Sequence, residues 1–168
     1  MIIEAILKIN PNAQVVVRGN DINTCEIEWH NGTTPISKAD IEAQFPIVEF
    51  DMAMKDLRTK RNKLLQDTDH YALSDQTLSD DMRTYRQSLR DITNGLTTVE
   101  EVNAVELDNA MADLRTKRNQ LLIDTDFHAL SDNTMSEDMT TYRQELRDIT
   151  EGITTVEQAN AVVFPTKP

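Results

Sequence analysis

A long internal repeat constrains the fold of this 168-residue chain more than any other feature of the sequence. When the sequence is shifted by 57 positions, residues 53–105 align without gaps to residues 110–162. The two copies are identical at 39 positions and differ at 14, a match that composition bias does not produce. Because such duplications are typical of supersecondary units that occur in tandem, one local fold is expected twice.

Each copy is predicted to form a helical hairpin. In the first copy, the helical spacing of Met54 and Leu57 indicates a helix that ends near Asp67. The loop that follows contains turn and capping residues, namely Ser74, Asp75, Thr77 and Ser79. Ser79 is the expected N-cap of a second helix, and Gly95 is expected to end that helix.

The second helix is expected to bury a narrow apolar seam, which consists of Met82, Tyr85, Leu89 and Ile92. A third helix is expected to open at Thr97, with Glu100 completing a capping box. The pattern recurs in the second copy at Ser136, Met139, Tyr142, Leu146, Ile149, Gly152, Thr154 and Glu157. Residues 97–125 contain no glycine or proline, so a single helix can join the copies. A change of apolar phase at Asp108 and Asn109 is equally compatible with a break there.

The first 50 residues lie outside the repeat and predict a small α+β module. An apolar stretch at residues 2–9 indicates a helix. A β-branched run at residues 15–17 and an alternating pattern at residues 25–29 indicate two strands. A capping pattern indicates a second helix at residues 37–45. The fold class is therefore an α+β N-terminal module (helix, β-hairpin, helix) followed by mainly α tandem helical hairpin repeats. The expected domains are residues 1–50, 51–108 and 109–164, with a C-terminal tail at residues 165–168.

Charge and composition argue against several classes of function. The chain has 17 Lys and Arg against 29 Asp and Glu, and this net charge of −12 opposes binding to nucleic acid or to an anionic membrane surface. The single Cys25 rules out an internal disulfide framework, and one thiol with three histidines cannot build a closed zinc site. No apolar run approaches the roughly 18 residues of a transmembrane helix, and no signal peptide is recognised, so a soluble protein without membrane insertion is expected.

Paired aspartates are the strongest candidates for a metal site, and their spacing does not favour one. An EF-hand loop that starts at Asp67 would need a glycine at Ala72 and a glutamate at Leu78. The acidic residues concerned, Asp67, Asp69 and Asp75 with their counterparts Asp124, Asp126 and Asp132, are instead expected to cap helices and to pair with arginines. The sequence also lacks the common phosphate-binding, dinucleotide and hydrolase motifs. No catalytic residue, metal or cofactor is therefore expected, and the chain is expected not to be an enzyme.

Arginines that recur in both copies form the candidate partner-binding set. These residues are Arg58, Arg61, Arg86, Arg90, Arg115, Arg118, Arg143 and Arg147. The default expectation is that they form ion pairs within each hairpin, with partners such as Asp67, Asp69 and Asp91. The alternative is that one row of arginines faces a partner protein, because arginine is favoured at interfaces.

The repeat resembles the tail assembly chaperone-like domain of tailed bacteriophages. The shared blocks are L-R-T-K-R-N-x-L-L at residues 57–65, T-D at 68–69, L-S-D at 73–75 and Y-R-Q-x-L-R-D-I at 85–92, and they recur at 114–122, 125–126, 130–132 and 142–149. The family usually has a tryptophan where this chain has His70 and Phe127, and a bulky aromatic residue where it has Met82 and Met139. The resemblance implies a helical hairpin that acts in the tail region of a phage.

The N-terminal module is similar to the XkdW-like family, which is encoded near phage tail-fibre genes. The resembling stretches are E-A-I-L-K-I-N-P-N-A-Q at residues 4–14 and W-H-N-G-T-T-P-I at residues 29–36. Together the resemblances imply a virion structural or adaptor protein of the tail, baseplate or tail fibre, made in the host cytoplasm. Its expected partners are other tail proteins, and a homo-oligomer in a symmetric assembly is compatible with this role. The open alternatives are an assembly chaperone absent from the mature virion and an acidic host-directed inhibitor.

Overall fold

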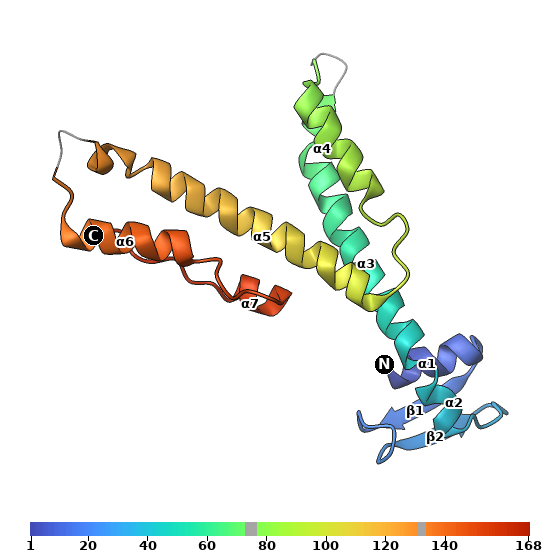
Figure 1. Cartoon of the computed structure of the whole chain (residues 1–168). Coiled ribbons are helices and arrows are strands. Elements are labelled where there is room, and N and C mark those ends of the chain that lie inside the picture. The colour runs from blue at the N-terminus through green and yellow to red at the C-terminus, as the bar shows by residue number, and fades with distance from the viewer. Residues whose placement is uncertain (73–76, 131–133) are drawn as a thin grey trace. The chain divides into compact units, whose positions relative to one another are not determined.

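The computed structural model describes residues 1–72, 77–130 and 134–168 and divides the chain into two compact units, Met1–Val102 and Asn103–Pro168. The order of elements confirms the expected fold class, because a helix and a two-stranded hairpin are followed by segments that are mostly helical (Figure 1). Within the described ranges, none of the helices combines the length and the apolar character needed to span a bilayer.

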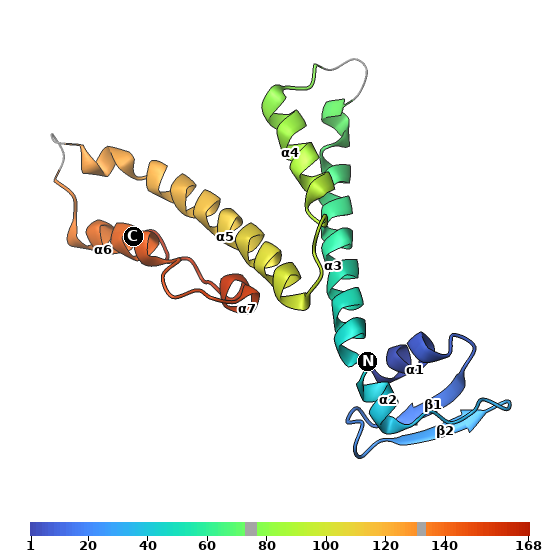
Figure 2. The ribbon, with the colours of Figure 1, turned by 45° about the vertical axis from the view of Figure 1, so that its right-hand side comes forward.

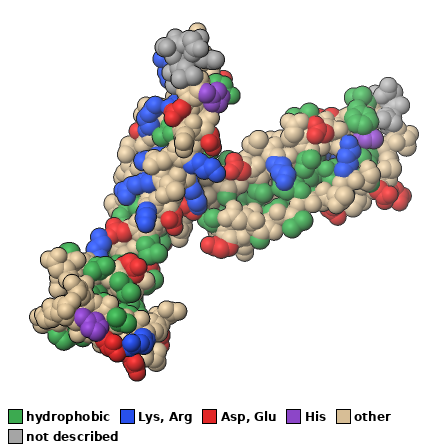
Figure 3. All heavy atoms as spheres, turned by 180° about the vertical axis from the view of Figure 1, so that it is seen from behind, with side chains coloured by type: hydrophobic (Ala, Val, Ile, Leu, Met, Phe, Trp, Pro, Cys, Tyr) green, Lys and Arg blue, Asp and Glu red, His purple; other side chains and the backbone are tan. Residues whose placement is uncertain are grey.

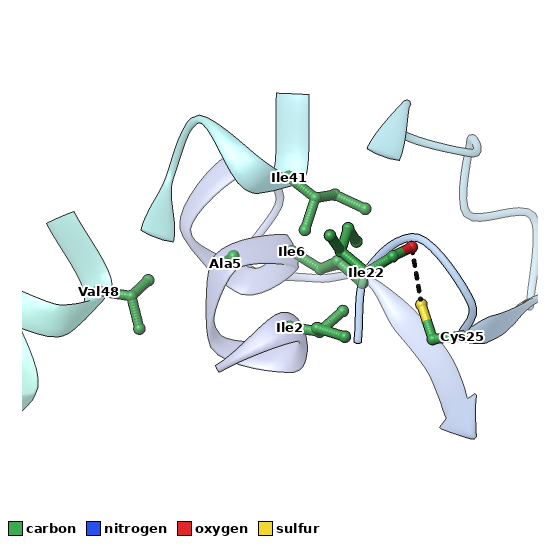
Figure 4. Close-up of a cluster of buried hydrophobic side chains, with 7 residues drawn as sticks. All are labelled: Ile2, Ala5, Ile6, Ile22, Cys25, Ile41 and Val48. Atoms are coloured by element: carbon green, nitrogen blue, oxygen red, sulfur yellow. Dashed lines mark hydrogen bonds between the residues drawn. The ribbon is translucent and has the colours of Figure 1, made fainter. Parts of the chain in front are cut away.

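The N-terminal module packs two strands and two helices around one small core. Its elements are α1 (Ile2–Ile9), β1 (Gln14–Arg18), β2 (Glu26–His30) and α2 (Lys38–Glu42). The strands are antiparallel, with Val15 opposite Trp29 and Val17 opposite Ile27, so these alternate side chains pack on the same core. The buried core residues are Ile2, Ala5, Ile6, Ile22, Cys25, Ile41 and Val48 (Figure 4). Cys25 lies just before β2, and its buried thiol donates to the carbonyl of Ile22 at 3.5 Å.

A long helix joins this module to the first repeat. Helix α2 begins after Ser37, whose side chain accepts a hydrogen bond from the Asp40 amide. Helix α3 (Phe45–Asp67) follows almost at once, and Pro46 fits its first turn because the amides there need no helical partner. Val48 on α3 belongs to the core of the module. The module and the first hairpin therefore share one helix.

The second helix of the first hairpin begins where predicted, but it ends at Asp91, so the prediction that Gly95 ends it is wrong by four residues. Helix α3 ends at Asp67, a short 3-10 turn (Asp69–Ala72) follows, and α4 (Asp80–Asp91) returns alongside α3 (Figures 1 and 2). Ser79 is the N-cap of α4 and accepts a hydrogen bond from the Met82 amide at 3.2 Å. Gly95 follows α4 with a φ of 77°, which favours glycine. The predicted turn residues Ser74 and Asp75 lie outside the described residues.

Helix α5 (Val99–Ile123) runs without interruption from the first repeat into the second, so the break considered at Asp108 and Asn109 is wrong. The predicted capping box is wrong by one residue, since the Glu101 amide donates to Thr98 Oγ1. The Glu101 carboxylate in turn accepts hydrogen bonds from the Thr97 and Thr98 amides, at 2.6 and 3.1 Å. Both Thr97 with Glu100 and Thr98 with Glu101 have the spacing of a capping box. The second pairing forms, and it lets the Glu101 carboxylate accept from two amides that have no helical partner.

The second unit repeats the hairpin and adds a short helix. Its remaining elements are a 3-10 turn (Asp126–Ala129), α6 (Glu137–Asp148) and α7 (Val156–Asn160). Ser136 caps α6 as predicted, and α6 lies alongside α5 in both ribbon views (Figures 1 and 2). Thr155 and Gln158 form the capping box of α7, so the predicted box at Thr154 and Glu157 is also displaced by one residue.

The two copies bury their apolar seams differently. Tyr142 is 3% exposed and shares a core with Met139 and Leu146, against which Phe164 of the C-terminal segment packs. Tyr85, its counterpart, is 41% exposed, so the prediction that it lies in a buried seam is wrong. The reason is that Phe164 belongs to an extended segment after α7, whereas the corresponding part of the first copy continues as helix α5.

Candidate functional site

A buried arginine holds the first hairpin together near the end of α3. Arg86 on α4 is 6% exposed, and its Nη1 donates to the Leu65 carbonyl at 2.9 Å and to Thr68 Oγ1 at 2.6 Å. Its Nη2 donates to Asp69 Oδ1 at 2.7 Å. We call Arg86 with these three acceptors an arginine clasp.

The same clasp occurs in the second hairpin. Arg143 on α6 is also 6% exposed, and its Nη1 donates to the Leu122 carbonyl at 2.9 Å and to Thr125 Oγ1 at 2.6 Å. Its Nη2 donates to Asp126 Oδ1 at 2.9 Å. Because all four residues occupy equivalent positions in the repeat, the duplication has preserved one hydrogen-bonding geometry twice.

Helix geometry explains why an arginine suits this place. The Leu65 and Leu122 carbonyls already accept the amides of Thr68 and Thr125, at 3.2 and 3.1 Å. They lie at the negative end of the helix dipole, where a cation is stabilising. The planar guanidinium can reach a carbonyl, a hydroxyl and a carboxylate together. In the second clasp the hydroxyl of Thr125, which is 1% exposed, also donates to the carbonyls of Leu121 and Leu122. The clasp thus fixes each returning helix to the end of the helix before it and to the start of the 3-10 turn.

These contacts test the ion pairs expected within the hairpins. The expectation is confirmed for Arg86 with Asp69, and the equivalent pair joins Arg143 to Asp126. Asp91 instead accepts hydrogen bonds from the side-chain amides of Gln87 and Asn94. The structure thus gives the two buried arginines of the candidate set an internal role.

The other arginines of the set fall into two groups. Arg61 and Arg118 are half-buried; Arg61 Nη1 donates to Thr93 Oγ1 at 3.3 Å, and Arg118 Nε donates to Asn119 Oδ1 at 3.1 Å. The exposed group, which we call the outer arginines, consists of Arg58, Arg90, Arg115 and Arg147. Binding of a partner by these residues stays a prediction.

Near its turn, each hairpin has two adjacent aromatic side chains whose rings contact each other at a tilt, 39° in the first copy and 35° in the second. The rings of His70 and Tyr71 lie with their centroids 3.9 Å apart, and so do the rings of Phe127 and His128. The histidine comes first in His70–Tyr71 and second in Phe127–His128. The two histidines therefore do not align in the repeat, although each copy has a histidine next to an aromatic ring.

Acidic side chains outside the clasp serve local structure. Hydrogen bonds from the Thr97 amide and hydroxyl and from the Thr98 amide lower the pKa of Glu101. Across the two-stranded sheet, a hydrogen bond from Arg18 and the charge of its guanidinium lower the pKa of Glu28. Among the residues that the structure describes, no group of three or more His, Cys, Asp or Glu side chains could hold a metal ion. Asp75 and Asp132, part of the calcium interpretation, lie outside those residues.

A shallow groove of about 250 Å³ lies in the second unit between α5 and the C-terminal segment. Its lining includes Ala110, Leu114, Lys117, Ala159, Val162 and Phe164, and the ammonium of Lys117 lies 4.4 Å from the centre of the Phe164 ring. The residue equivalent to Ala159 in the first copy is Val102, which is 1% exposed. Ala159 thus has two methyl groups fewer than its counterpart, and it lines the groove.

The described geometry defines a mainly helical protein, built from an α+β module and two clasped helical hairpins. Comparison with protein families then gives a direct match: the model described as "Phage tail assembly chaperone protein" matches residues 54–103 and 111–168. These segments make up more than half of the chain, so the chain belongs to this family. Neither the curated proteins nor the solved structures gave a match.

The two matched segments coincide with the two hairpins, which is consistent with tandem copies of the family's domain. The family is a non-enzymatic kind of protein with a role related to the phage tail. The matched segments do not include the N-terminal module, so its similarity to the XkdW-like family stays a prediction.

Proposed function

We propose that this protein is an adaptor of the phage tail, baseplate or tail fibre, which binds other tail proteins through its two hairpins and remains in the virion. The observation that carries the proposal is the duplicated clasp. It uses Arg86 and Arg143 internally and leaves an exposed arginine at equivalent positions of α3 and α5. One chain can therefore offer two similar basic positions to two similar sites on a symmetric partner.

The positions of the outer arginines support this role. Arg58 on α3 and Arg115 on α5 are both exposed and each precedes the same T-K-R-N sequence. Exposed arginines contribute little to the stability of a monomer but can bind carboxylates of a partner with two parallel hydrogen bonds. The chain has a net charge of −12 and would repel an acidic partner at most of its surface, so the exposed arginines are the positions where such a partner could bind.

The N-terminal module is proposed to dock this adaptor to the tail, as its XkdW-like resemblance implies. Residues 1–50, 51–108 and 109–164 are proposed as three units of sequence ancestry. Helix α3 runs through the first inner boundary and helix α5 through the second.

A transient assembly chaperone is the second candidate, and the family's description favours it. In that role the same surfaces would hold a tail or fibre protein during morphogenesis and release it before the particle matures. The third candidate, an acidic inhibitor of a host protein, has no support from the family match and predicts a host partner instead of a tail partner.

Charge reversal of the outer arginines tests the adaptor proposal. A phage that encodes Arg58→Glu together with Arg115→Glu is expected to incorporate less of the protein into its particles, as measured by quantitative mass spectrometry. The matched control reverses two exposed lysines elsewhere, Lys55→Glu and Lys167→Glu, and is expected to incorporate normally. Normal incorporation of the arginine variant would contradict the proposed binding face.

A further inference from the structure

The end of the second hairpin exposes three large apolar side chains. Ile123 is the last residue of α5, and Phe127 and Leu130 lie in and just after the 3-10 turn. Their exposed fractions are 62%, 54% and 57%. Figure 3 shows apolar side chains gathered at this end of the hairpin. We call these three residues the apolar tip.

Acidic side chains border the apolar tip. Asp124 is exposed beside Ile123, and Asp126, beside Phe127, is 61% exposed even though it accepts a hydrogen bond from Arg143. Glu137 and Asp138 are exposed in the first turn of α6, which begins at the same end of the hairpin. Arg143 itself is buried, so its charge is directed into the hairpin and does not neutralise the outer surface.

The two copies of the repeat diverge at this end while their clasps stay identical. Five of the 14 differences fall at positions 66, 70, 71, 76 and 78 of the first copy, around its 3-10 turn. Where the second copy has Ile123 and Phe127, the first has Gln66 and His70. Because the first hairpin forms the same clasp with polar residues there, the fold does not require the apolar side chains of the second.

We propose that the apolar tip is a docking surface for a short segment of a tail protein that carries apolar side chains between lysines or arginines. Clustered and exposed apolar side chains mark interaction sites, and the acidic border is complementary to a basic flank. The inference rests on the proposed function, since a tail protein is taken to be the partner. Anionic lipid headgroups would be repelled by the same acidic border.

The clasp prepares this surface for binding. Arg143 holds Thr125 and Asp126, the two residues directly before Phe127, and the ring of Phe127 contacts that of His128 at a centroid distance of 3.9 Å. A turn fixed in this way loses little conformational freedom when a partner binds, which favours affinity.

An exchange of tip residues between the two hairpins tests the proposal in the full-length chain. One variant carries Ile123→Gln and Phe127→His, and the reciprocal variant carries Gln66→Ile and His70→Phe; each receives only residues that the other copy already accommodates. The probe is a short fluorescein-labelled peptide with leucine and phenylalanine between lysines, and its control peptide has glutamates in place of the lysines. Binding is measured by fluorescence anisotropy.

The first variant is expected to bind the lysine-flanked peptide roughly tenfold more weakly than the unmodified chain, and the reciprocal variant is expected to bind two peptides per chain. Added salt should weaken binding, because the border acts through exposed charges. Unchanged affinity in the first variant would overturn the docking surface, and equal affinity for the glutamate-flanked peptide would overturn the basic partner. Copurification of the unmodified chain with tail proteins is a separate measurement, so failure of the inference is distinguished from failure of the proposed function.

Discussion

Replacement of Arg143 by methionine is the most informative perturbation of the scaffold. Methionine keeps much of the apolar stem of arginine but removes the donors to the Leu122 carbonyl, Thr125 Oγ1 and Asp126 Oδ1. The equivalent change in the first hairpin is Arg86→Met. The clasps have matching acceptors, so the two variants should behave alike.

The expected loss follows from which groups the substitution leaves without a partner. A buried ion pair that loses one member costs about 3–5 kcal/mol when the remaining charge stays buried. Here Asp126 is 61% exposed and regains water, and the Leu122 carbonyl keeps a hydrogen bond from Thr125 at 3.0 Å. In addition, Arg143 Nε is buried without a hydrogen-bond partner in the described structure, and its removal is favourable. We therefore expect a destabilisation of about 2 kcal/mol, within the range for hydrogen bonds to a charged group.

Hydrogen exchange resolves this loss hairpin by hairpin, which global unfolding of a chain with two compact units does not. Amides of α6 should exchange about 30-fold faster in Arg143→Met, and those of α4 should do so in Arg86→Met. Arg147→Met changes an exposed arginine on α6 and should alter the free energy of opening by less than about 0.5 kcal/mol. An effect of Arg143→Met as small as that of Arg147→Met would refute the role of the clasp.

Three further changes test the packing and the caps. Tyr142→Ala should destabilise its hairpin by about 3 kcal/mol, as measured by hydrogen exchange, because the Tyr142 ring is 3% exposed. Tyr85→Ala should cost less than about 1 kcal/mol, because the Tyr85 ring is 41% exposed. Equal losses would contradict the difference in burial. Ala159→Val, which copies Val102, should stabilise the second unit by about 1 kcal/mol as measured by hydrogen exchange of its amides, and a destabilisation would show that the groove cannot accept two methyl groups. Hydrogen bonds in the folded chain lower the pKa of Glu101, so the stability that this carboxylate contributes is present above its unfolded pKa near pH 4 and is lost as the pH falls through its folded pKa. The loss should be visible in an NMR titration of the α5 amides, and Glu101→Gln should abolish it. A transition that persists in this variant would exclude this carboxylate as its source.

The sequence was sufficient to predict features that depend on neighbouring residues. Ser79 and Ser136 cap their helices because a hydroxyl can accept from an amide three residues later whatever the rest of the chain does. The capping boxes of α5 and α7 were displaced by one residue because adjacent threonines offer two nearly equivalent registers. Local patterns thus predict that α5 and α7 begin near these threonines. The residue at which each helix begins depends on which hydrogen bonds form.

Features that depend on distant partners could not be predicted in the same way. Tyr85 and Tyr142 lie in identical local sequences, and their burial differs because Phe164 packs on only one of the two cores. The clasp was foreseen only as ion pairs between the recurring arginines and nearby aspartates, of which Arg86 with Asp69 is one. Its buried state depends on a carbonyl and a hydroxyl at the end of α3, 21 and 18 residues away respectively, whose positions a charge pattern does not reveal.

Quantitative mass spectrometry of purified particles is the most direct test of the proposed adaptor role. The account predicts that this chain is present at a fixed ratio to the other tail proteins, and that the ratio persists after particles are washed in high salt. Absence of the chain from mature particles, together with its presence in complexes isolated during assembly, would contradict the adaptor and identify a transient chaperone.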